Sequence, residues 1–376
     1  MKYCNNCLQT DTRPNIRFDD HGVCPACNYH ASLLDVDFEV RKEELAEIIA
    51  FGKEHNHSGY DCIIGVSGGK DSTRQAIFVR ESLGMNPLLV SLSYPPEQLT
   101  QMGVDNVSNL IRLGFDCISI SPAPQTWRAL MRKSFIEHTN WCKSTELALY
   151  SSVPRIAIAY QIPLIWWGEN NALQVGDLGV MGNGGADGNN LRNMDTLDGA
   201  DITWLLSNEI KKNQILQYVY PSNKEMQDAN LQIKFLGYFW KDWSLLDNAN
   251  FSTLRGLQIR NNKPWEIGDP WGVTALDEDW VNLNQMIKYL KFGFGRTSDY
   301  VNEDIRNGRI TREEGIALCN LFDGTYSASS IEAFSDYIGI TVNKFWAQVD
   351  KSFNKELFIR KGLGKYKPRF KVGVGL

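Results

Sequence analysis

The fold of this chain is decided by residues 61–73, which run Asp-Cys-Ile-Ile-Gly-Val-Ser-Gly-Gly-Lys-Asp-Ser-Thr. The first part, Cys62 to Val66, is apolar and predicts a buried β-strand. A glycine-rich turn, Ser67 to Ser72, follows it, and beyond the turn apolar residues recur at the spacing of one helix face. The stretch therefore predicts a strand, a tight turn and a helix in immediate succession.

This turn has the chemistry of a phosphate-binding loop. The start of a helix offers unpaired backbone N–H groups and a partial positive charge, and both favour an anion. Gly68 and Gly69 let the backbone approach phosphate oxygens closely, and Lys70 adds a full positive charge. Asp71 is unfavourable beside an anion unless a metal lies between them, so it indicates Mg²⁺ bound with the phosphates. A plain turn joining a strand to a helix is the alternative.

Strands and helices continue to alternate along the chain. Further apolar runs predict strands at 88–92, 115–120 and 163–167, and helical patterns occupy 36–57, 98–113, 126–135 and 144–160. This order predicts an α/β fold with a mainly parallel sheet and helices on both faces. Ligands of such sheets bind beyond the carboxyl ends of the strands. The turn Gly168-Glu169-Asn170 is therefore expected to meet the turn at 67–72.

Glu169 and Asn170 are candidate site residues because of this expected position. A carboxylate there can hold Mg²⁺ or orient a nucleophile, and an amide can bind a sugar or an exocyclic group. A helix cap or a solvated turn explains both residues equally well.

Four cysteines near the start form a second candidate site. Cys4, Cys7, Cys24 and Cys27 make two C-x-x-C pairs with 16 residues between them, which matches the spacing of a four-thiolate zinc site. Four thiolates complete the coordination of one Zn²⁺, so the site is expected to be structural and to fold about 30 residues that have little core. An iron–sulfur cluster uses the same ligands, whereas two disulfides do not suit a reducing compartment.

The whole chain has the composition of a soluble globular protein. It has 376 residues, of which 43% are hydrophobic and 22% charged, and its net charge is −5. An acidic chain without a basic run is a poor candidate for nucleic-acid binding. Because no signal-peptide pattern and no apolar stretch of spanning length is present, we expect a cytoplasmic protein without a membrane span.

The length accommodates three parts: a zinc-binding module at 1–35, a sheet domain at 36–200 and a mainly helical C-terminal region at 201–376. Within the second part, Gly176–Asn190 has six glycines in fifteen residues and predicts a long loop, either a lid or a surface loop. In the third part, two short helices are expected within 298–324. Before them, the turn at 293–296 presents Arg296, which suits a carboxylate or phosphate unless it is merely solvated.

The turn Ser67-Gly68-Gly69-Lys70-Asp71-Ser72 resembles the PP-loop of ATP pyrophosphatases and lacks the spacing of a Walker loop. The resemblance implies a PP-loop/HUP-like fold and cleavage of ATP to AMP and pyrophosphate. Such enzymes adenylate an oxygen, which a nitrogen or sulfur nucleophile then displaces. It also implies that ATP and Mg²⁺ are bound by Ser67, Gly68, Gly69, Lys70, Asp71, Ser72 and Thr73.

A narrower resemblance rests on the order of several motifs. These are Met1–Cys7, Asp11–Pro14, Gly22–Cys27, Val66–Thr73, Trp167–Asn170 and Lys291–Arg296. Together they are similar to the N-acetyl sugar amidotransferases of the WbpG and PseA type, from the first residue to about residue 325. Leu8-Gln9-Thr10 departs from the Val-Met-Pro expected there, at a place that does not bear on the chemistry.

This resemblance implies amidination of an acetamido group on a nucleotide-linked sugar. The acetamido oxygen attacks the α-phosphorus of ATP, pyrophosphate leaves, and ammonia then displaces AMP. Catalytic roles fall to Lys70, Asp71 and Glu169, and substrate binding to Asn170 and Arg296. The first choice of substrate is UDP-2,3-diacetamido-2,3-dideoxy-mannuronic acid for lipopolysaccharide O-antigen, and pseudaminic or legionaminic acid is the second.

Ammonia is expected from a separate glutaminase, because no cysteine in the sequence has the setting of a glutaminase nucleophile. The resemblance implies glutaminase and cyclase-like subunits similar to those of imidazole glycerol phosphate synthase. Sulfur transfer to tRNA is the main rival function, with Cys142 as its candidate thiol. An inactive nucleotide-binding scaffold is a third possibility.

Overall fold

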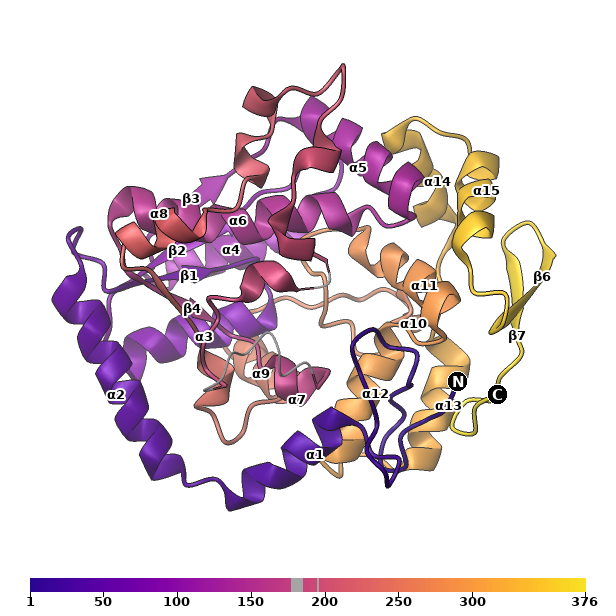
Figure 1. Ribbon diagram of the computed structural model, residues 1–376, viewed down its shortest axis with the longest axis horizontal. Helices are drawn as coiled ribbons and strands as arrows, with labels where there is room; N and C mark the ends of the chain where they lie inside the picture. Colours follow the sequence, from indigo (N-terminus) through magenta and orange to yellow (C-terminus); the bar gives the residue numbers. More distant parts are fainter. Residues whose placement is uncertain (177–184, 195) are drawn as a thin grey trace.

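The computed structural model describes residues 1–176, 185–194 and 196–376. A five-stranded sheet forms its centre and consists of β1 (Cys62–Gly65), β2 (Pro87–Leu92), β3 (Cys117–Ile120), β4 (Leu164–Trp167) and β5 (Gln232–Phe235). Its strands pair in parallel, in the order β3-β2-β1-β4-β5 (Figure 1). The predicted parallel α/β fold is confirmed.

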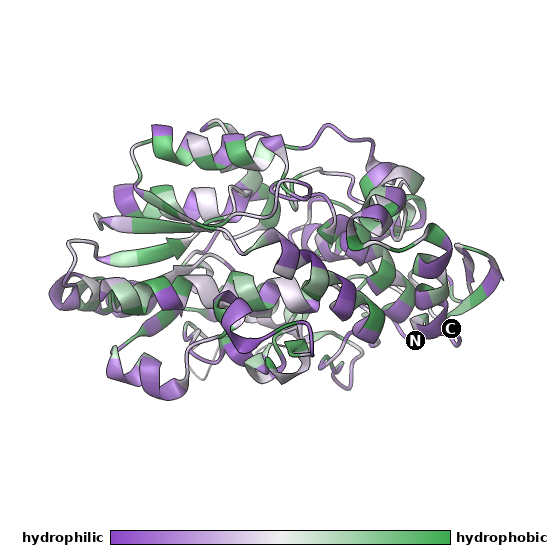
Figure 2. Cartoon of the chain, turned by 90° about the horizontal axis from the view of Figure 1, so that it is seen from above, coloured by the Kyte–Doolittle hydropathy of each residue, from purple (hydrophilic) through white to green (hydrophobic). Residues whose placement is uncertain are grey.

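Both faces of the sheet are apolar, which explains why helices cover both. On one face, Ile64 packs with residues of α2 (Phe38–His55), α3 (Lys70–Glu81) and α4 (Gln101–Arg112). On the opposite face, Ile63 packs against α6 (Cys142–Tyr160), because successive side chains of a strand point in opposite directions. Figure 2 shows helices above and below the strands. The predicted two-sided cover is confirmed.

The C-terminal region is mainly helical, as predicted. It contains α8 (Asn223–Asp228), α9 (Leu245–Thr253), α10 (Pro264–Ile267), α11 (Val281–Phe292), α12 (Arg296–Arg306), α13 (Arg312–Phe322), α14 (Ala328–Ile338) and α15 (Val342–Ser352). An antiparallel hairpin of β6 (Phe358–Gly362) and β7 (Lys365–Pro368) follows. The helices α12 and α13 are the two short helices that the sequence predicts within 298–324.

A second core joins the C-terminal region to the sheet region. Aromatic side chains of α5 (Pro124–His138), α14 and α15 meet in it, and Phe135 stacks on Phe345 with ring centroids 5.1 Å apart. The sheet also takes β5 from beyond residue 200, where the sequence predicts the helical region. The two larger parts therefore share both a core and a sheet.

The N-terminal module lies against α12 and α13, and its helix α1 (Pro25–Ser32) packs on the short helix α7 (Asn171–Gln174). Of the predicted glycine loop at 176–190, residues 177–184 lie outside the described residues. The end of that loop lies alongside β5, because the Gly188 N–H donates to the Ile233 carbonyl at 2.7 Å.

Candidate active site and metal centre

The glycine-rich turn lies at the carboxyl end of β1, as predicted. β1 ends at Gly65 and α3 begins at Lys70, so four residues connect strand and helix. Gly68 has φ +73°, and a Cβ there would lie 3.0 Å from Asn106 Cβ. Only glycine therefore fits this close approach to α4 without strain.

A buried lysine, Lys70, forms an ion pair with the half-buried Asp71 at the start of α3. Lys70 Nζ lies 2.8 Å from Asp71 Oδ2, and Asn248 of α9 donates to Asp71 Oδ1 at 2.7 Å. Burial alone would lower the pKa of Lys70, but Asp71 and the Tyr300 hydroxyl outweigh it and hold the pKa above its usual value. Lys70 is therefore a permanent cation beside the glycine turn.

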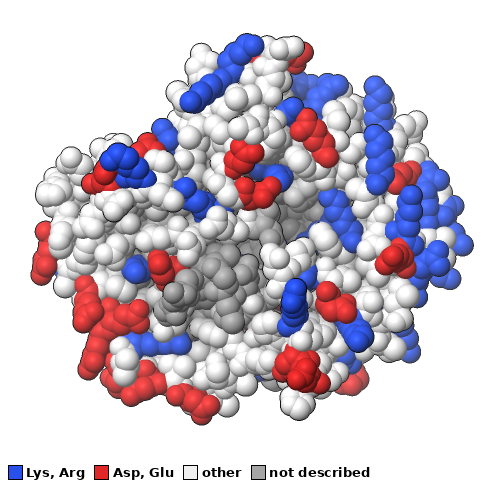
Figure 3. All heavy atoms as spheres, viewed as in Figure 1, with Lys and Arg blue, Asp and Glu red and all other residues white. Residues whose placement is uncertain are grey.

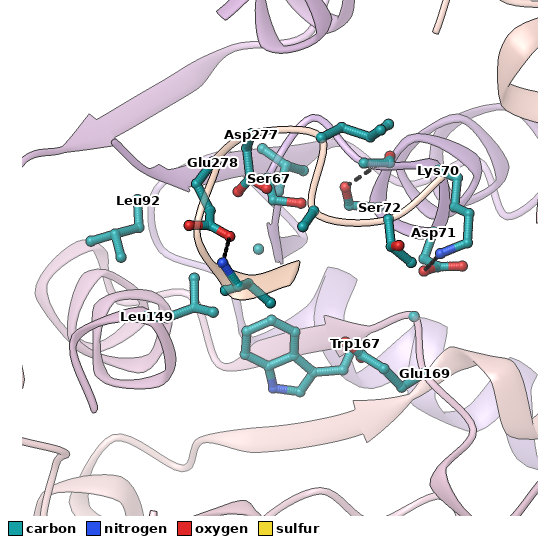
Figure 4. Close-up of a pocket in the computed structure, with 18 of the residues that line it drawn as sticks. Ser67, Lys70, Asp71, Ser72, Leu92, Leu149, Trp167, Glu169, Asp277 and Glu278 are labelled. Carbon is teal, nitrogen blue, oxygen red and sulfur yellow. Dashed lines mark hydrogen bonds and ion pairs between the residues drawn. The ribbon is translucent and has the colours of Figure 1, made fainter. Parts of the chain in front are cut away.

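A cavity of about 410 Å³ lies beyond the carboxyl ends of the strands, and both predicted turns line it. The first turn contributes Ser67, Gly69, Lys70, Asp71 and Ser72, and the second contributes Gly168 and Glu169. The predicted meeting of the two turns is confirmed. In Figure 4 the Lys70–Asp71 pair lies on the same side of the cavity as Glu169.

Glu169 has the acid–base properties of a catalytic carboxyl group. Burial raises its pKa to about 7, and the charge of Asp71 adds to this shift. A carboxyl group of this pKa changes protonation near neutral pH, which suits proton transfer.

Four further acids that no sequence motif marks line the cavity: Glu146, Asp277, Glu278 and Asp299. Asp277 and Glu278 belong to an irregular segment before α11, and Figure 4 shows them near Ser67. Burial raises the pKa of Asp277 to about 7, and the charge of Glu278 adds to it. Glu278 is held in place by Gln98, which donates to it at 2.8 Å. No local pattern marks this segment, because it reaches the site through its contact with α4, where Thr100 N–H donates to the Asp277 carbonyl.

Arg296 lines the cavity at the start of α12. Its Nε is buried and has no hydrogen-bond partner among the described residues. A guanidinium group with an unused buried donor is suited to an anionic ligand.

Two more cations stand behind Arg296, where the Asp299 carboxylate pairs with Arg13 and, at 2.7 Å, with Lys288. Burial would raise the pKa of Asp299, but Lys288, Arg13 and Arg296 outweigh it and hold the pKa well below its usual range. Three cations therefore surround the Asp299 carboxylate at this end of the cavity, where the Glu146 carboxyl group also lines the wall.

Asn170 lies directly after Glu169, as predicted, but its side chain is used away from the cavity. It does not line the cavity, and only 1% of its surface is exposed. Its Oδ1 accepts from Leu173 N–H at 3.0 Å and its Nδ2 donates to the Gly237 carbonyl at 3.1 Å, so it caps α7. The helix-cap alternative accounts for this residue, and no amide group is left for a substrate.

Gly68 and Thr73 also lie outside the cavity lining. Gly68 shapes the turn, and Thr73 is buried in the first turn of α3.

Cys4, Cys7, Cys24 and Cys27 come together as a buried cluster whose four sulfurs all lie within 4.8 Å of one another. Cys4 Sγ is 3.9 Å from Cys27 Sγ, and Cys7 Sγ is 3.7 Å from Cys24 Sγ. One metal ion with metal–sulfur bonds of about 2.3 Å in a tetrahedron requires sulfurs about 3.8 Å apart. The cluster therefore fits a single metal ion.

Arg306 connects this cluster to the wall of the cavity. It ends α12, and its Nη1 lies 3.9 Å from Cys7 Sγ while its Nη2 donates to the Leu173 carbonyl of α7 at 2.8 Å. The helix α7 comes shortly after Glu169, and α12 begins with Arg296. The Arg306 side chain therefore connects the cysteine cluster to the two elements that carry Glu169 and Arg296 at the cavity.

Burial raises the pKa of each of the remaining described thiols. Cys142 is 3% exposed and absent from the cavity lining, and burial raises its pKa well above the usual value. Burial does the same for Cys62 and Cys319, and it raises the pKa of Cys117 to about 11. These thiols lack the thiolate character of a nucleophile.

The sheet order, with a glycine-rich loop at the end of β1, defines a PP-loop-type α/β protein. Within that class, residues 259–370 match the family model described as LPS biosynthesis protein WbpG-like, C-terminal domain. This part of the chain, less than a third of its length, is similar to that domain. The resemblance to the WbpG type is thereby confirmed.

Two individual proteins are also similar to parts of this chain. The uncharacterized protein MJ1599 of Methanocaldococcus jannaschii is 27% identical over 112 residues, which are 29% of this chain and 38% of that protein. The match thus spans well under half of the relative's length. The U34-tRNA thiolase NcsA from Methanococcus maripaludis, solved with its [4Fe-4S] cluster, aligns with 72% of this chain and 78% of its own at 12% identity and a TM-score of 0.30. This last similarity is too low to bear on function.

None of the helices in the described residues combines the length and apolar character that crossing a bilayer requires.

Proposed function

We propose that this protein is an ATP-dependent amidotransferase that converts an acetamido group of a nucleotide-activated sugar into an acetamidino group. The observation that carries the proposal is the cavity in which the Ser67–Ser72 turn, Glu169 and Arg296 meet. A phosphate-binding turn, a carboxyl group that titrates near neutrality and a free guanidinium group are what adenylation of an anionic substrate needs.

In the first step, the acetamido oxygen bonds to the α-phosphorus of ATP and the bond to the pyrophosphate oxygen breaks. The backbone N–H groups of the turn and Lys70 neutralise the charge that develops on the phosphates. Asp71, held by Lys70 and Asn248, offers a carboxylate oxygen for the Mg²⁺ that accompanies ATP and screens its charge.

In the second step, ammonia bonds to the imidate carbon and AMP leaves with the former acetamido oxygen. Ammonia must arrive unprotonated, although most of it is ammonium at neutral pH. Glu169, with a pKa near 7, accepts a proton in this step. Adenylation is required because an unactivated amide oxygen is a poor leaving group.

Arg296 binds an anionic part of the sugar substrate, supported by the positive charge of Arg13 and Lys288. We propose UDP-2,3-diacetamido-2,3-dideoxy-mannuronic acid as the substrate, in a pathway for lipopolysaccharide O-antigen. The family description of residues 259–370 as lipopolysaccharide-biosynthetic supports this choice. Pseudaminic or legionaminic acid is the alternative substrate.

The metal at the four cysteines is Zn²⁺ in this proposal. The short sulfur–sulfur distances support a single ion, because in a [4Fe-4S] cluster each thiolate binds a different iron and the sulfurs lie farther apart. Four thiolates leave no open position on the ion, so its role is structural.

Ammonia comes from a separate glutaminase that acts with a cyclase-like subunit, similar to those of imidazole glycerol phosphate synthase. The burial and raised pKa of the described thiols outside the metal site support this division of labour. The same thiols argue against sulfur transfer to tRNA, since Cys142 does not reach the cavity.

The proposal is tested by measuring AMP and pyrophosphate formed from ATP, Mg²⁺ and excess ammonium chloride, with and without the UDP-diacetamido sugar. Sugar-dependent AMP and a sugar product in which one oxygen is replaced by NH are expected. AMP formation with an unchanged sugar would redirect the search to nine-carbon sugars. Formation of AMP only with tRNA would favour the thiolation alternative.

A further inference from the structure

The last 36 residues have a charge opposite to that of the rest of the chain. Residues 341–376 contain nine lysines and arginines and two acidic residues, a net charge of +7. Because the whole chain has a net charge of −5, the preceding 340 residues carry −12. This asymmetry is hidden in the overall acidic composition.

All nine basic side chains are exposed: Lys344, Lys351, Lys355, Arg360, Lys361, Lys365, Lys367, Arg369 and Lys371. They come from α15, from the β6–β7 hairpin and from the segments that adjoin it. In Figure 3, blue side chains gather along the edge of the molecule where Figure 1 places these elements. We call this surface the basic face.

Local packing holds the basic face in one orientation. Three aromatic side chains of the same segment are partly buried against one another. Tyr366 packs against Trp346 of α15 and against Phe353, the residue after that helix. Asp350 is also used internally, since it accepts from Arg360 and from the Tyr366 hydroxyl. This pairing takes up one acidic and one basic side chain, and it leaves eight basic side chains and Glu356 on this surface.

The tip of the hairpin adds an apolar residue to this charge. Leu363 is 48% exposed, and it lies between Lys361 and Lys365. Val374, 70% exposed, follows the hairpin close in sequence. Exposed apolar side chains flanked by lysines are the pattern of surfaces that insert shallowly into a charged bilayer.

We propose that the basic face binds the anionic surface of a lipid membrane, with Leu363 entering the headgroup region. The elements that form this face are helical and hairpin segments outside the cavity lining, so the inference is independent of the proposed chemistry. Single-stranded nucleic acid is disfavoured, because such sites interleave basic side chains with exposed aromatic rings, and the rings here are partly buried by packing on one another.

The proposal is tested by sedimenting the full-length protein with vesicles. Vesicles of phosphatidylcholine that contain about 30% phosphatidylglycerol are compared with pure phosphatidylcholine at low and high salt. We expect binding to the anionic vesicles only, and release at high salt because the attraction is electrostatic. Equal binding to both vesicles, or binding to neither, would overturn the proposal.

A triple variant locates the surface. Lys361→Glu, Lys365→Glu and Lys367→Glu together should weaken vesicle binding by on the order of a hundredfold, since each lysine near the membrane contributes about 1 kcal/mol. The control triple Lys53→Glu, Lys211→Glu and Lys212→Glu makes the same change in net charge on other exposed lysines and should bind as the wild type does. An equal loss in both triples would mean that only net charge matters, and the assignment of this face would fail.

A single substitution tests the same surface by vesicle binding if the triple variant folds poorly. Leu363→Ser should weaken binding several-fold, while Leu321→Ser, at a 62% exposed leucine of α13, should not. Strong binding of an RNA oligonucleotide, without binding to anionic vesicles, would also contradict the proposal.

Discussion

At the residue scale, Lys70 has two tasks that cannot be separated. It neutralises the half-buried Asp71, and its charge faces the turn that we propose binds the phosphates of ATP. Removing it leaves a half-buried carboxylate beside the position of an anion, which is costly for the bound state. The turn itself depends on Gly68, whose positive φ and close contact with α4 exclude a side chain.

We therefore expect Lys70→Ala to lower kcat/KM for AMP formation by on the order of 10²–10³-fold, as loss of one charge-stabilising group typically does. The control Lys42→Ala removes an exposed lysine that pairs with Glu39 on α2 and should leave the rate unchanged. Sugar-dependent release of AMP measures both. Full activity of the Lys70 variant would show that the turn does not bind ATP.

The pKa of Glu169 predicts how activity depends on pH. The carboxyl group accepts a proton only when it is deprotonated. At a constant concentration of unprotonated ammonia, kcat/KM for ammonia should therefore rise with pH until about pH 7 and then level off. Glu169→Gln should remove most of the activity and this rise with it. Asp277→Asn is the matched control, because Asp277 has a similar pKa and lines the same cavity. The rise of kcat/KM with pH should persist in this control. Persistence of the rise in the Glu169 variant would assign it to another group.

At the scale of the elements, α7 and α12 connect the metal site to the cavity. Arg306 reaches Cys7 Sγ and the Leu173 carbonyl, and Arg312 of α13 donates to the Cys7 carbonyl at 3.3 Å. The N-terminal module thus packs on the two helices that bring Glu169 and Arg296 to the cavity. Loss of the metal should disturb the cavity as well as the module.

Removal of one metal ligand tests this connection. Cys24→Ser should abolish stoichiometric metal binding and lower the unfolding midpoint by on the order of 10 °C, because metal binding contributes folding free energy. Cys117→Ser, at a thiol outside the cluster, should leave metal binding and the unfolding midpoint unchanged. Metal analysis and thermal unfolding give the two readouts. A metal-free variant with an unchanged midpoint would contradict a structural role for the site.

Arg306 tests the same connection without touching a ligand. Arg306→Gln should speed the release of metal to a chelator and raise KM for the sugar. Arg306→Lys keeps the charge, so its metal release and its KM should lie between those of the glutamine variant and the wild type. Tryptophan fluorescence and far-UV circular dichroism establish that the variants are folded. If metal release and KM are unchanged in the glutamine variant, Arg306 does not link the two sites.

The contact between α4 and the Asp277 segment is another element-scale feature. A Cβ at Gly103 would lie 2.4 Å from Asp277 Cα, so Gly103→Ala should cost about 1–3 kcal/mol of unfolding free energy and displace Asp277. Gly362→Ala is the control, because its Cβ would meet only a lysine methylene 3.9 Å away. Denaturant unfolding of both variants measures the difference, and equal stability would show that α4 and this segment do not pack so closely.

At the scale of the whole molecule, the sheet and the two short helices of 298–324 could be predicted from the sequence, because apolar runs and a glycine-rich turn are local signals. β5 could not, since Gln-Ile-Lys-Phe at an edge position is short and alternating and lies among helical patterns. Asp277 was missed because only its contact with α4 places it in the cavity. The sequence left two roles open for Asn170, because a helix cap and a ligand-binding amide have the same sequence pattern, and the structure shows the cap.

The shared sheet and shared core also predict how the chain behaves when it is divided. A fragment of residues 1–200 lacks β5, α9 and α12, and with them Asn248, Tyr300 and Arg296. We expect it to aggregate or to remain unfolded and to bind no ATP, whereas the full chain binds ATP. Gel filtration and nucleotide titration measure this, and a stable ATP-binding fragment would show that the first 200 residues form an independent domain.

Oxygen-18 labelling tests whether the acetamido oxygen of a sugar attacks ATP. The UDP-diacetamido sugar is labelled with ¹⁸O in its acetamido groups and incubated with the protein, ATP, Mg²⁺ and ammonium chloride. Our account predicts that one ¹⁸O appears in AMP and none in pyrophosphate, while the sugar loses one ¹⁸O and gains NH. AMP without the label would mean that water, and not the sugar, attacks ATP, and the amidotransferase assignment would be wrong.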